Sequence, residues 1–251
     1  MNKQKLIFLD IDGTIYNDSA QIMDSTRAAI KQARENGHKI IFNTGRIKAA
    51  LPEDVLELEH DGFITSAGAH VEIGNRCILD MAMGQKELYY IYNYFRDNKI
   101  LFNLENNAKI FHGYEINDLQ DKAINKVVFY DSVISVAQIK SDIGTHCNVI
   151  GVNHHHSSLY HGEIFIKNVN KATGIQVITE YYAANREDTV AFGDALIDLE
   201  MLQYAGIGVA MENAHSKVKQ IADRITKDNN SDGIYHGFIE CGLINAVSAL
   251  G

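Results

Sequence analysis

One short segment constrains the fold of this chain more than any other: an apolar run that ends in two closely spaced acids. Leu6 to Leu9 are all apolar, Asp10 and Asp12 follow, and Gly13 and Thr14 come directly after them. A continuous apolar run of this length predicts a buried parallel strand, whose carboxyl end lies at the edge where open α/β sheets bind ligands. Two acids crowded at that edge repel each other unless a cation neutralises them. The segment therefore predicts a divalent-metal site.

Helical and strand-like segments alternate along most of the chain. A helical pattern from Thr26 to Asn36 ends at Gly37, and the apolar run from Lys39 to Phe42 leads into Thr44. This order of strand, helix and strand is a βαβ unit, and its repetition predicts an α/β protein with a doubly wound, Rossmann-like parallel sheet. The further segments expected in this core are helices at Asp54–Leu58, Lys171–Tyr182 and His215–Ala222, strands at Phe63–Thr65, Thr189–Phe192, Ile207–Ala210 and Arg224–Thr226, and a hairpin at Ala69–Ile73 and Cys77–Leu79.

The rhythm changes between residues 81 and 167. The segments expected there are a helix at Lys86–Arg96 and short strands at Ile100–Leu104, Lys109–Phe111, Lys126–Tyr130 and Asn148–Val152. We therefore expect residues 1–80 and 168–251 to form the core, and residues 81–167 to form an inserted α+β domain. The tract His154–His156 in this insertion is expected to be a polar surface loop, because adjacent strand residues point to opposite faces and cannot all share one metal ion.

Polar residues follow three separate apolar strands of the predicted core. Asp10, Thr44 and Asp194 each occupy such a position, and Asp198 lies four residues after Asp194, in the first turn of the next helix. Because the carboxyl ends of parallel strands meet at one edge of the sheet, acids far apart in the sequence can share one metal ion there. The alternative is that the acids only form turns, which are common in loops.

Lys171 stands in the first turn of a predicted helix that Asn170 can cap. A lysine at that end opposes the positive pole of the helix dipole, whereas a bound anion would reverse the sign of the interaction. The sequence thus favours an anion beside Lys171. A solvated surface lysine is the alternative.

These residues form a pattern that resembles the haloacid dehalogenase superfamily. Four motifs occur in the family's order: DIDGT from Asp10, NTGR from Asn43, the lysine that opens a helix, and GDALID from Gly193. VAMENA from Val209 and DGI from Asp232 are similar to the Cof-type, sugar-phosphatase-like subgroup. The resemblance covers essentially the whole chain, loosely in the insertion, and implies a core that carries the chemistry and an inserted cap domain.

The resemblance also implies a role for each of these side chains. Asp10 would be the nucleophile that forms an aspartyl phosphate, and Asp12 would be the general acid and base. Mg²⁺ would be the cofactor, and the residues implied to hold it are the Asp10 carboxylate, the Asp12 carbonyl, Asp194, and Asp198 either through water or by orienting Lys171. The residues implied to bind the phosphoryl group or the substrate are Thr44, Gly45, Arg46, Lys171 and Asn213.

Arg46 and Asn213 have alternatives as an ordinary surface arginine and a turn asparagine. The sequence departs from the subgroup at Ile197 and Ala67, where asparagine is usual, and at Ala195, where glycine or serine is common. None of these departures removes an acid or the lysine, so we expect them to affect substrate preference or rate.

Composition limits the partners. A net charge of −9 and an isoelectric point near 5.6 argue against nucleic acid and anionic membranes, both of which require a basic surface. No apolar stretch approaches a membrane span, the N-terminal segment does not resemble a signal peptide, and three widely spaced cysteines are typical of reduced thiols, so we expect a cytoplasmic location. We expect a monomer or homodimer.

The sequence therefore predicts a Mg²⁺-dependent phosphatase that acts on a small phosphorylated metabolite, with a sugar phosphate as the leading class. Two alternatives stay open. One is a phosphomutase, in which Asp12 returns the phosphoryl group to the substrate. The other is a regulatory protein that binds a phosphometabolite with little turnover, which the changes at Ile197 and Ala67 suggest.

Overall fold

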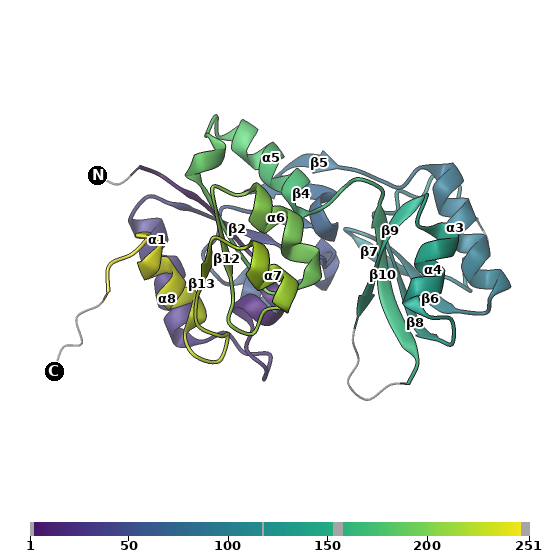
Figure 1. Cartoon of the computed structure of the whole chain (residues 1–251). Coiled ribbons are helices and arrows are strands. Elements are labelled where there is room, and N and C mark those ends of the chain that lie inside the picture. Colours follow the sequence, from purple (N-terminus) through teal and green to yellow (C-terminus); the bar gives the residue numbers. More distant parts are fainter. Residues whose placement is uncertain (1–2, 117, 153–157, 247–251) are drawn as a thin grey trace.

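The structure is a computed structural model that describes residues 3–116, 118–152 and 158–246. In this part of the chain, two β-sheets organise the fold (Figure 1). The larger, eight-stranded sheet has the order β13 (Arg224–Ile225), β12 (Ile207–Ala210), β11 (Thr189–Gly193), β1 (Leu6–Leu9), β2 (Lys39–Asn43), β3 (Gly62–Thr65), β4 (His70–Ile73) and β5 (Arg76–Asp80). Strands β13 to β3 are parallel, and β4 and β5 add an antiparallel hairpin. The predicted loop at His154–His156 lies outside the described residues.

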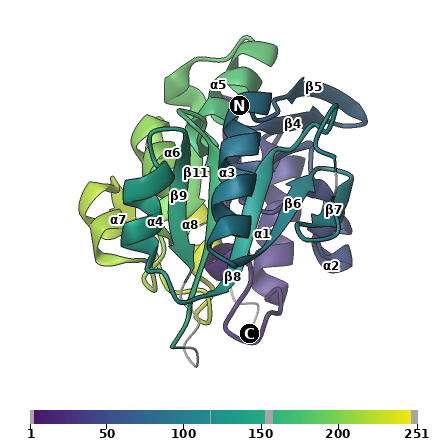
Figure 2. The ribbon, with the colours of Figure 1, turned by 90° about the vertical axis from the view of Figure 1, so that its right-hand side faces the viewer.

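Helices cover both faces of this sheet, as predicted (Figures 1 and 2). Helix α1 (Asp24–Glu35) packs against α8 (Gly233–Glu240) on one side, and α5 (Lys171–Tyr181), α6 (Leu199–Tyr204) and α7 (Ser216–Ile221) lie on the other. The short helix α2 (Glu53–Leu56) precedes β3. Strand β1 is buried along its whole length, which is why its sequence is uniformly apolar. The predicted α/β, doubly wound fold is confirmed.

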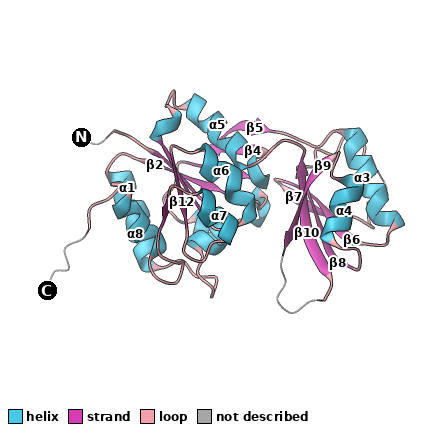
Figure 3. Ribbon diagram, viewed as in Figure 1, coloured by secondary structure: helices cyan, strands magenta, loops and turns pink. Residues whose placement is uncertain are grey.

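The second sheet is antiparallel and has five strands in the described part of the chain. Its order is β7 (Lys109–His112), β6 (Leu101–Asn106), β8 (Lys126–Ser132), β10 (Tyr160–Ile166) and β9 (Cys147–Val152). Helices α3 (Gln85–Asp97) and α4 (Val136–Ile143) cover its outer face, and the opposite face turns toward the larger sheet (Figures 1 and 3). A separate apolar cluster, which includes Phe95 and Phe129, fills the space between this sheet and its helices.

Two elements of this second unit, α4 and β10, were not predicted from the sequence. Strand β10 contains Gly162 and Glu163 among its apolar residues, which weakens the apolar signal of a strand. Asp198 also differs slightly from its predicted place: it ends a 3₁₀ turn at Leu196–Asp198 and directly precedes α6. No helix among the described residues has the length and apolar character that a membrane crossing requires.

Candidate active site

The site begins where β1 ends. The backbone N–H of Asp10 donates to the carbonyl of Phe192 at 3.0 Å, which fixes Asp10 beside the end of β11. The chain then turns at Gly13, whose φ of +86° lies in the left-handed region. A Cβ at this position would also lie 2.3 Å from a carboxylate oxygen of Asp194. Glycine is therefore required here both for the turn and for the close approach of that acid.

Lys171 connects the first motif to the last. Asn170 caps α5 by accepting a hydrogen bond from the N–H of Ala172 at 3.0 Å, and Lys171 is the first residue of the helix. Its side chain is completely buried, and its Nζ donates to Oδ1 of Asp10 and Oδ1 of Asp198, each at 2.5 Å. Burial alone lowers the pKa of Lys171, but the two carboxylates outweigh burial and raise it above its ordinary value. The alternative of a solvated surface lysine is wrong.

Three carboxylates converge beside this lysine. Asp10, Asp194 and Asp198 each offer an oxygen, and these oxygens lie within 4.8 Å of one another. Asp198 accepts backbone N–H bonds from Asp194 at 3.0 Å and Ala195 at 2.9 Å, while Thr14 donates to Asp194 at 2.9 Å. The three predicted acids therefore come together, with one lysine opposite them.

The electrostatics of the cluster favour a cation. Burial, followed by the charge of Asp198, raises the pKa of Asp10 well above its usual range, and the same two causes raise the pKa of Asp194 to about 7. Three ionised carboxylates beside one ammonium group leave two negative charges uncompensated. Oxygen ligands of this number and charge suit a hard divalent cation such as Mg²⁺. The residues present therefore fit the metal that the sequence predicted.

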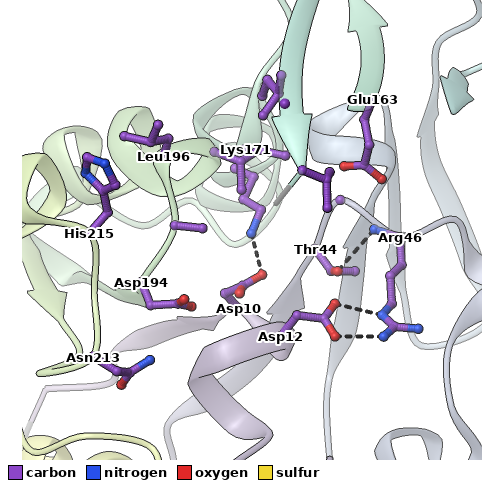
Figure 4. Close-up of a pocket in the computed structure, with 16 residues that line it drawn as sticks. Asp10, Asp12, Thr44, Arg46, Glu163, Lys171, Asp194, Leu196, Asn213 and His215 are labelled. Atoms are coloured by element: carbon purple, nitrogen blue, oxygen red, sulfur yellow. Dashed lines mark hydrogen bonds and ion pairs between the residues drawn. The ribbon is translucent and has the colours of Figure 1, made fainter. Parts of the chain in front are cut away.

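Asp12 faces away from the acidic cluster and toward Arg46 (Figure 4). The guanidinium of Arg46 donates to both carboxylate oxygens of Asp12, at 2.8 Å and 2.7 Å. Both side chains line the same cavity and remain partly exposed. This two-bond ion pair holds Arg46 beside Asp12 in the lining of the cavity.

The loop after β2 forms the opposite wall. Thr44 is buried, its Oγ1 accepts from the N–H of Arg46 at 3.1 Å, and Gly45 lines the cavity beside it. Asn213 also lines the cavity and donates to the carbonyl of Gly13 at 2.8 Å. The structure thus brings together every residue that the sequence analysis had placed at the site.

The cavity has a volume of about 640 Å³ and lies between the two sheets. Its lining includes residues that the sequence analysis missed: Ile150, Gly151, Val152, Glu163, Leu196 and His215. Of these, Glu163 is a charged residue that the second unit contributes to the cavity (Figure 4). No local motif marks Glu163, because its position depends on how β10 faces the core.

Ile197 and Ala67, which stand where the subgroup usually has asparagine, each have a distinct structural setting. Ile197 lines the cavity, and its Cδ1 would lie 3.3 Å from a Cβ placed on Gly45, so it forms an apolar wall. Ala67 has φ +53° and ψ +40°, the left-handed conformation that asparagine tolerates better than alanine. Asparagine at this position would therefore ease backbone strain.

Comparison with known proteins agrees with the resemblance found in the sequence motifs. A family model described as haloacid dehalogenase-like hydrolase matches residues 7–117 and 112–238. The 5-amino-6-(5-phospho-D-ribitylamino)uracil phosphatase YitU of Bacillus subtilis is 29% identical over 259 residues, covering 92% of this chain and 95% of the relative. The putative phosphatase YkrA of the same organism is 29% identical over 275 residues, covering 96% of this chain and 98% of the relative.

Solved structures resemble this one over nearly its whole length. The HAD subclass IIB sugar phosphatase BT4131 superposes with a TM-score of 0.84 at 26% identity, covering 96% of this chain and all (100%) of the other. The phosphatase BT1666 from Bacteroides thetaiotaomicron gives a TM-score of 0.82 at 24% identity, with 96% of each chain covered, and shows the same fold. The resemblance stated from the sequence motifs is confirmed.

Proposed function

The chain belongs to the haloacid dehalogenase-like hydrolase family, and from this premise we propose that it is a Mg²⁺-dependent phosphatase that hydrolyses a small phosphorylated metabolite, with sugar phosphates as the leading class. Curated relatives are phosphatases, and one similar structure is a sugar phosphatase. The observation that carries the proposal is Lys171, fully buried between Asp10 and Asp198 at the acidic cluster. A cavity of about 640 Å³ suits a small ester.

The chemistry requires a nucleophile and a proton carrier. In the proposed first step, a carboxylate oxygen of Asp10 attacks phosphorus, the ester P–O bond breaks, and Asp12 gives its proton to the departing alkoxide. In the second step, water attacks the phosphorus of the aspartyl phosphate, Asp12 takes the water's proton, and phosphate leaves. Asp10 is thereby restored and Asp12 is again protonated.

Arg46 relates to this cycle through its contact with Asp12. The guanidinium binds the ionised carboxylate, which is the form that accepts a proton from water. Donating a proton to the leaving group requires the protonated form, so Asp12 has to leave this pair for the first step. We therefore propose that the Arg46 contact opens and closes once per turnover.

Other residues would bind and orient the phosphoryl group. Lys171 and the Oγ1 of Thr44 would donate to its oxygens as negative charge spreads over them. Asp198 would hold Lys171 in place through the 2.5 Å contact. Asp10, Asp194 and the carbonyl of Asp12 would hold Mg²⁺, which would neutralise charge on the phosphoryl oxygens when bound.

The second unit would act as a cap. We propose that residues 81–167 form this domain and that residues 1–80 and 168–251 form the catalytic core. The division follows the two sheets. Strand β5, the last strand of the larger sheet before the chain enters the smaller one, ends at Asp80, and β10, the last strand of the smaller sheet in chain order, ends at Ile166. A cap over the carboxyl edge would exclude water and contact the leaving group.

Phosphate release from p-nitrophenyl phosphate and from a panel of phosphometabolites tests the proposal. We expect the wild type to require Mg²⁺, to lose activity in EDTA, and to lose about 10³-fold or more in kcat in Asp10→Asn, because the amide is a poor nucleophile. Asp223→Asn, which lies away from the cavity, is the matched control and should retain activity. A wild type without metal-dependent release across the panel would refute the proposal and favour the regulatory alternative.

A further inference from the structure

The inner face of the smaller sheet carries charge where a core would be apolar. Along β10, Ile164 belongs to the apolar cluster under α3 and α4, whereas Glu163 and Phe165 lie on the opposite face. Glu163 lines the active-site cavity, and Phe165 lies 3.6 Å from the position of a Cβ on Gly45. The alternation of the strand thus directs a carboxylate from the second unit into the site (Figure 4).

A buried lysine holds this carboxylate. The Nζ of Lys126, on the neighbouring strand β8, donates to Oε1 of Glu163 at 2.5 Å and to the carbonyl of Gly45 at 3.0 Å. A second carboxylate, Glu105, lies 3.7 Å from the same Nζ. The side chain of Lys126 is 5% exposed and that of Glu163 is 23% exposed. The ammonium therefore ties Glu163 to the loop that carries Thr44.

One oxygen of Glu163 is left for a ligand. Oε2 accepts no hydrogen bond within the described part of the chain, and it lies 3.5 Å from the position of a Cβ on Gly45. Because Gly45 has no side chain, the space in front of this oxygen remains open. Gly45 directly follows Thr44, so the free acceptor lies beside the loop that carries Thr44, and it comes from the second unit, which we propose contacts the leaving group.

We propose that Glu163, fixed by Lys126, is a specificity determinant that selects phosphate esters whose leaving group is uncharged and rich in hydroxyl groups. The inference rests on the proposed phosphatase function. A carboxylate accepts hydrogen bonds and donates none, so a polyol or sugar hydroxyl satisfies Oε2. A leaving group with a carboxylate of its own would place two negative charges in one partly buried cavity, which is unfavourable.

Two esters with the same carbon chain test the proposal: sorbitol 6-phosphate, which is a neutral polyol, and 6-phosphogluconate, which carries a carboxylate. We expect the wild type to favour the polyol ester in kcat/KM by about tenfold or more, and Glu163→Gln to lower this preference by about tenfold, since a hydrogen bond to a charged group contributes on that scale. In the variant, Lys126 takes the amide oxygen and the NH₂ group faces the cavity, where it can donate to a carboxylate. Turnover of p-nitrophenyl phosphate, whose leaving group is not a polyol, reports in each variant whether phosphoryl transfer itself still occurs.

Glu105→Gln is the matched control, because Glu105 contacts the same lysine and does not line the cavity. It should leave the preference between the two esters unchanged. If the wild type hydrolyses p-nitrophenyl phosphate but favours 6-phosphogluconate, or turns over neither ester, or if both variants shift the preference equally, the inference is wrong and the phosphatase proposal stands. A wild type that hydrolyses none of the three compounds overturns both.

Discussion

Replacing Asp198 with asparagine tests the buried charge network most directly. Oδ1 of Asp198 accepts from Lys171 at 2.5 Å, and Oδ2 accepts from the N–H groups of Asp194 and Ala195 at 3.0 Å and 2.9 Å. Asparagine has only one acceptor oxygen. Whichever way the amide is turned, its NH₂ group meets donors in a side-chain position that has no solvent exposure (0%).

The magnitude follows from two opposing effects. Losing a hydrogen bond to a charged group and burying an unpaired donor together cost about 3–5 kcal/mol. Removing the charge of Asp198 relieves its repulsion with Asp10 and Asp194, whose pKa values it raises, and this offsets about 1 kcal/mol. We therefore expect the free energy of unfolding of Asp198→Asn to fall by about 2–4 kcal/mol.

Urea unfolding at pH 7.5, followed by circular dichroism in EDTA, measures this change without stabilisation by bound metal. Asp223→Asn is the matched control: Asp223 accepts from the N–H of Gly208 at 2.8 Å, and asparagine keeps an oxygen for that bond. The control should change stability by less than about 0.5 kcal/mol. If Asp198→Asn is as stable as the control, the contact between Asp198 and Lys171 does not contribute to the free energy of unfolding, and the prediction is wrong.

Three further predictions concern the pH dependence of metal binding, a strained backbone and a second ion-pair cluster. Burial, followed by the charge of a neighbouring carboxylate, raises the pKa of Asp194 to about 7. The Mg²⁺ affinity, measured by calorimetry, should therefore weaken about tenfold for each pH unit below that value. An affinity that does not change between about pH 5.5 and 7.5 would contradict this. Ala67→Gly should raise the free energy of unfolding in urea by about 0.5–1 kcal/mol, because φ is +53° at this position; a destabilised variant would show that the conformation is not strained. Burial raises the pKa of Asp61, but hydrogen bonds from a backbone N–H, Lys39 and Arg34 outweigh burial and lower this pKa. The Asp61 carboxylate therefore stabilises the fold above its pKa in the unfolded chain. This contribution is lost as the pH falls through the pKa of Asp61 in the folded protein. Asp61→Asn should therefore cost about 1 kcal/mol at pH 7 and less near pH 3 in urea unfolding; an equal cost at both pH values would contradict the role of its charge.

The core of the fold was readable from local patterns. The apolar run at Leu6–Leu9 is buried over its whole length, and helices and strands alternate around it as predicted. Asn170 caps the helix that Lys171 begins. Such features follow from the order of neighbouring residues, because strand burial and helix capping depend on the side chains within a few positions.

The second unit was harder to predict. Its helix α4 and strand β10 were missed, although four of its strands and α3 were anticipated. Gly162 and Glu163 interrupt the apolar character of β10, and the strand is held by its pairing with β8 and β9 on either side. Pairing of this kind joins residues far apart in the chain, so the local sequence underdetermines it.

The sequence by itself determined which residues are expected at the site: Asp10 and Asp12 at the end of one apolar strand, Lys171 at the start of a helix, and acids after another strand. Only the tertiary structure decided what each side chain contacts. It buried Lys171 between two carboxylates, turned Asp12 toward Arg46, and brought Glu163 from another sheet into the same cavity. The physical reason is that strand periodicity and caps are local, whereas burial and charge pairing depend on which distant segments the fold places side by side.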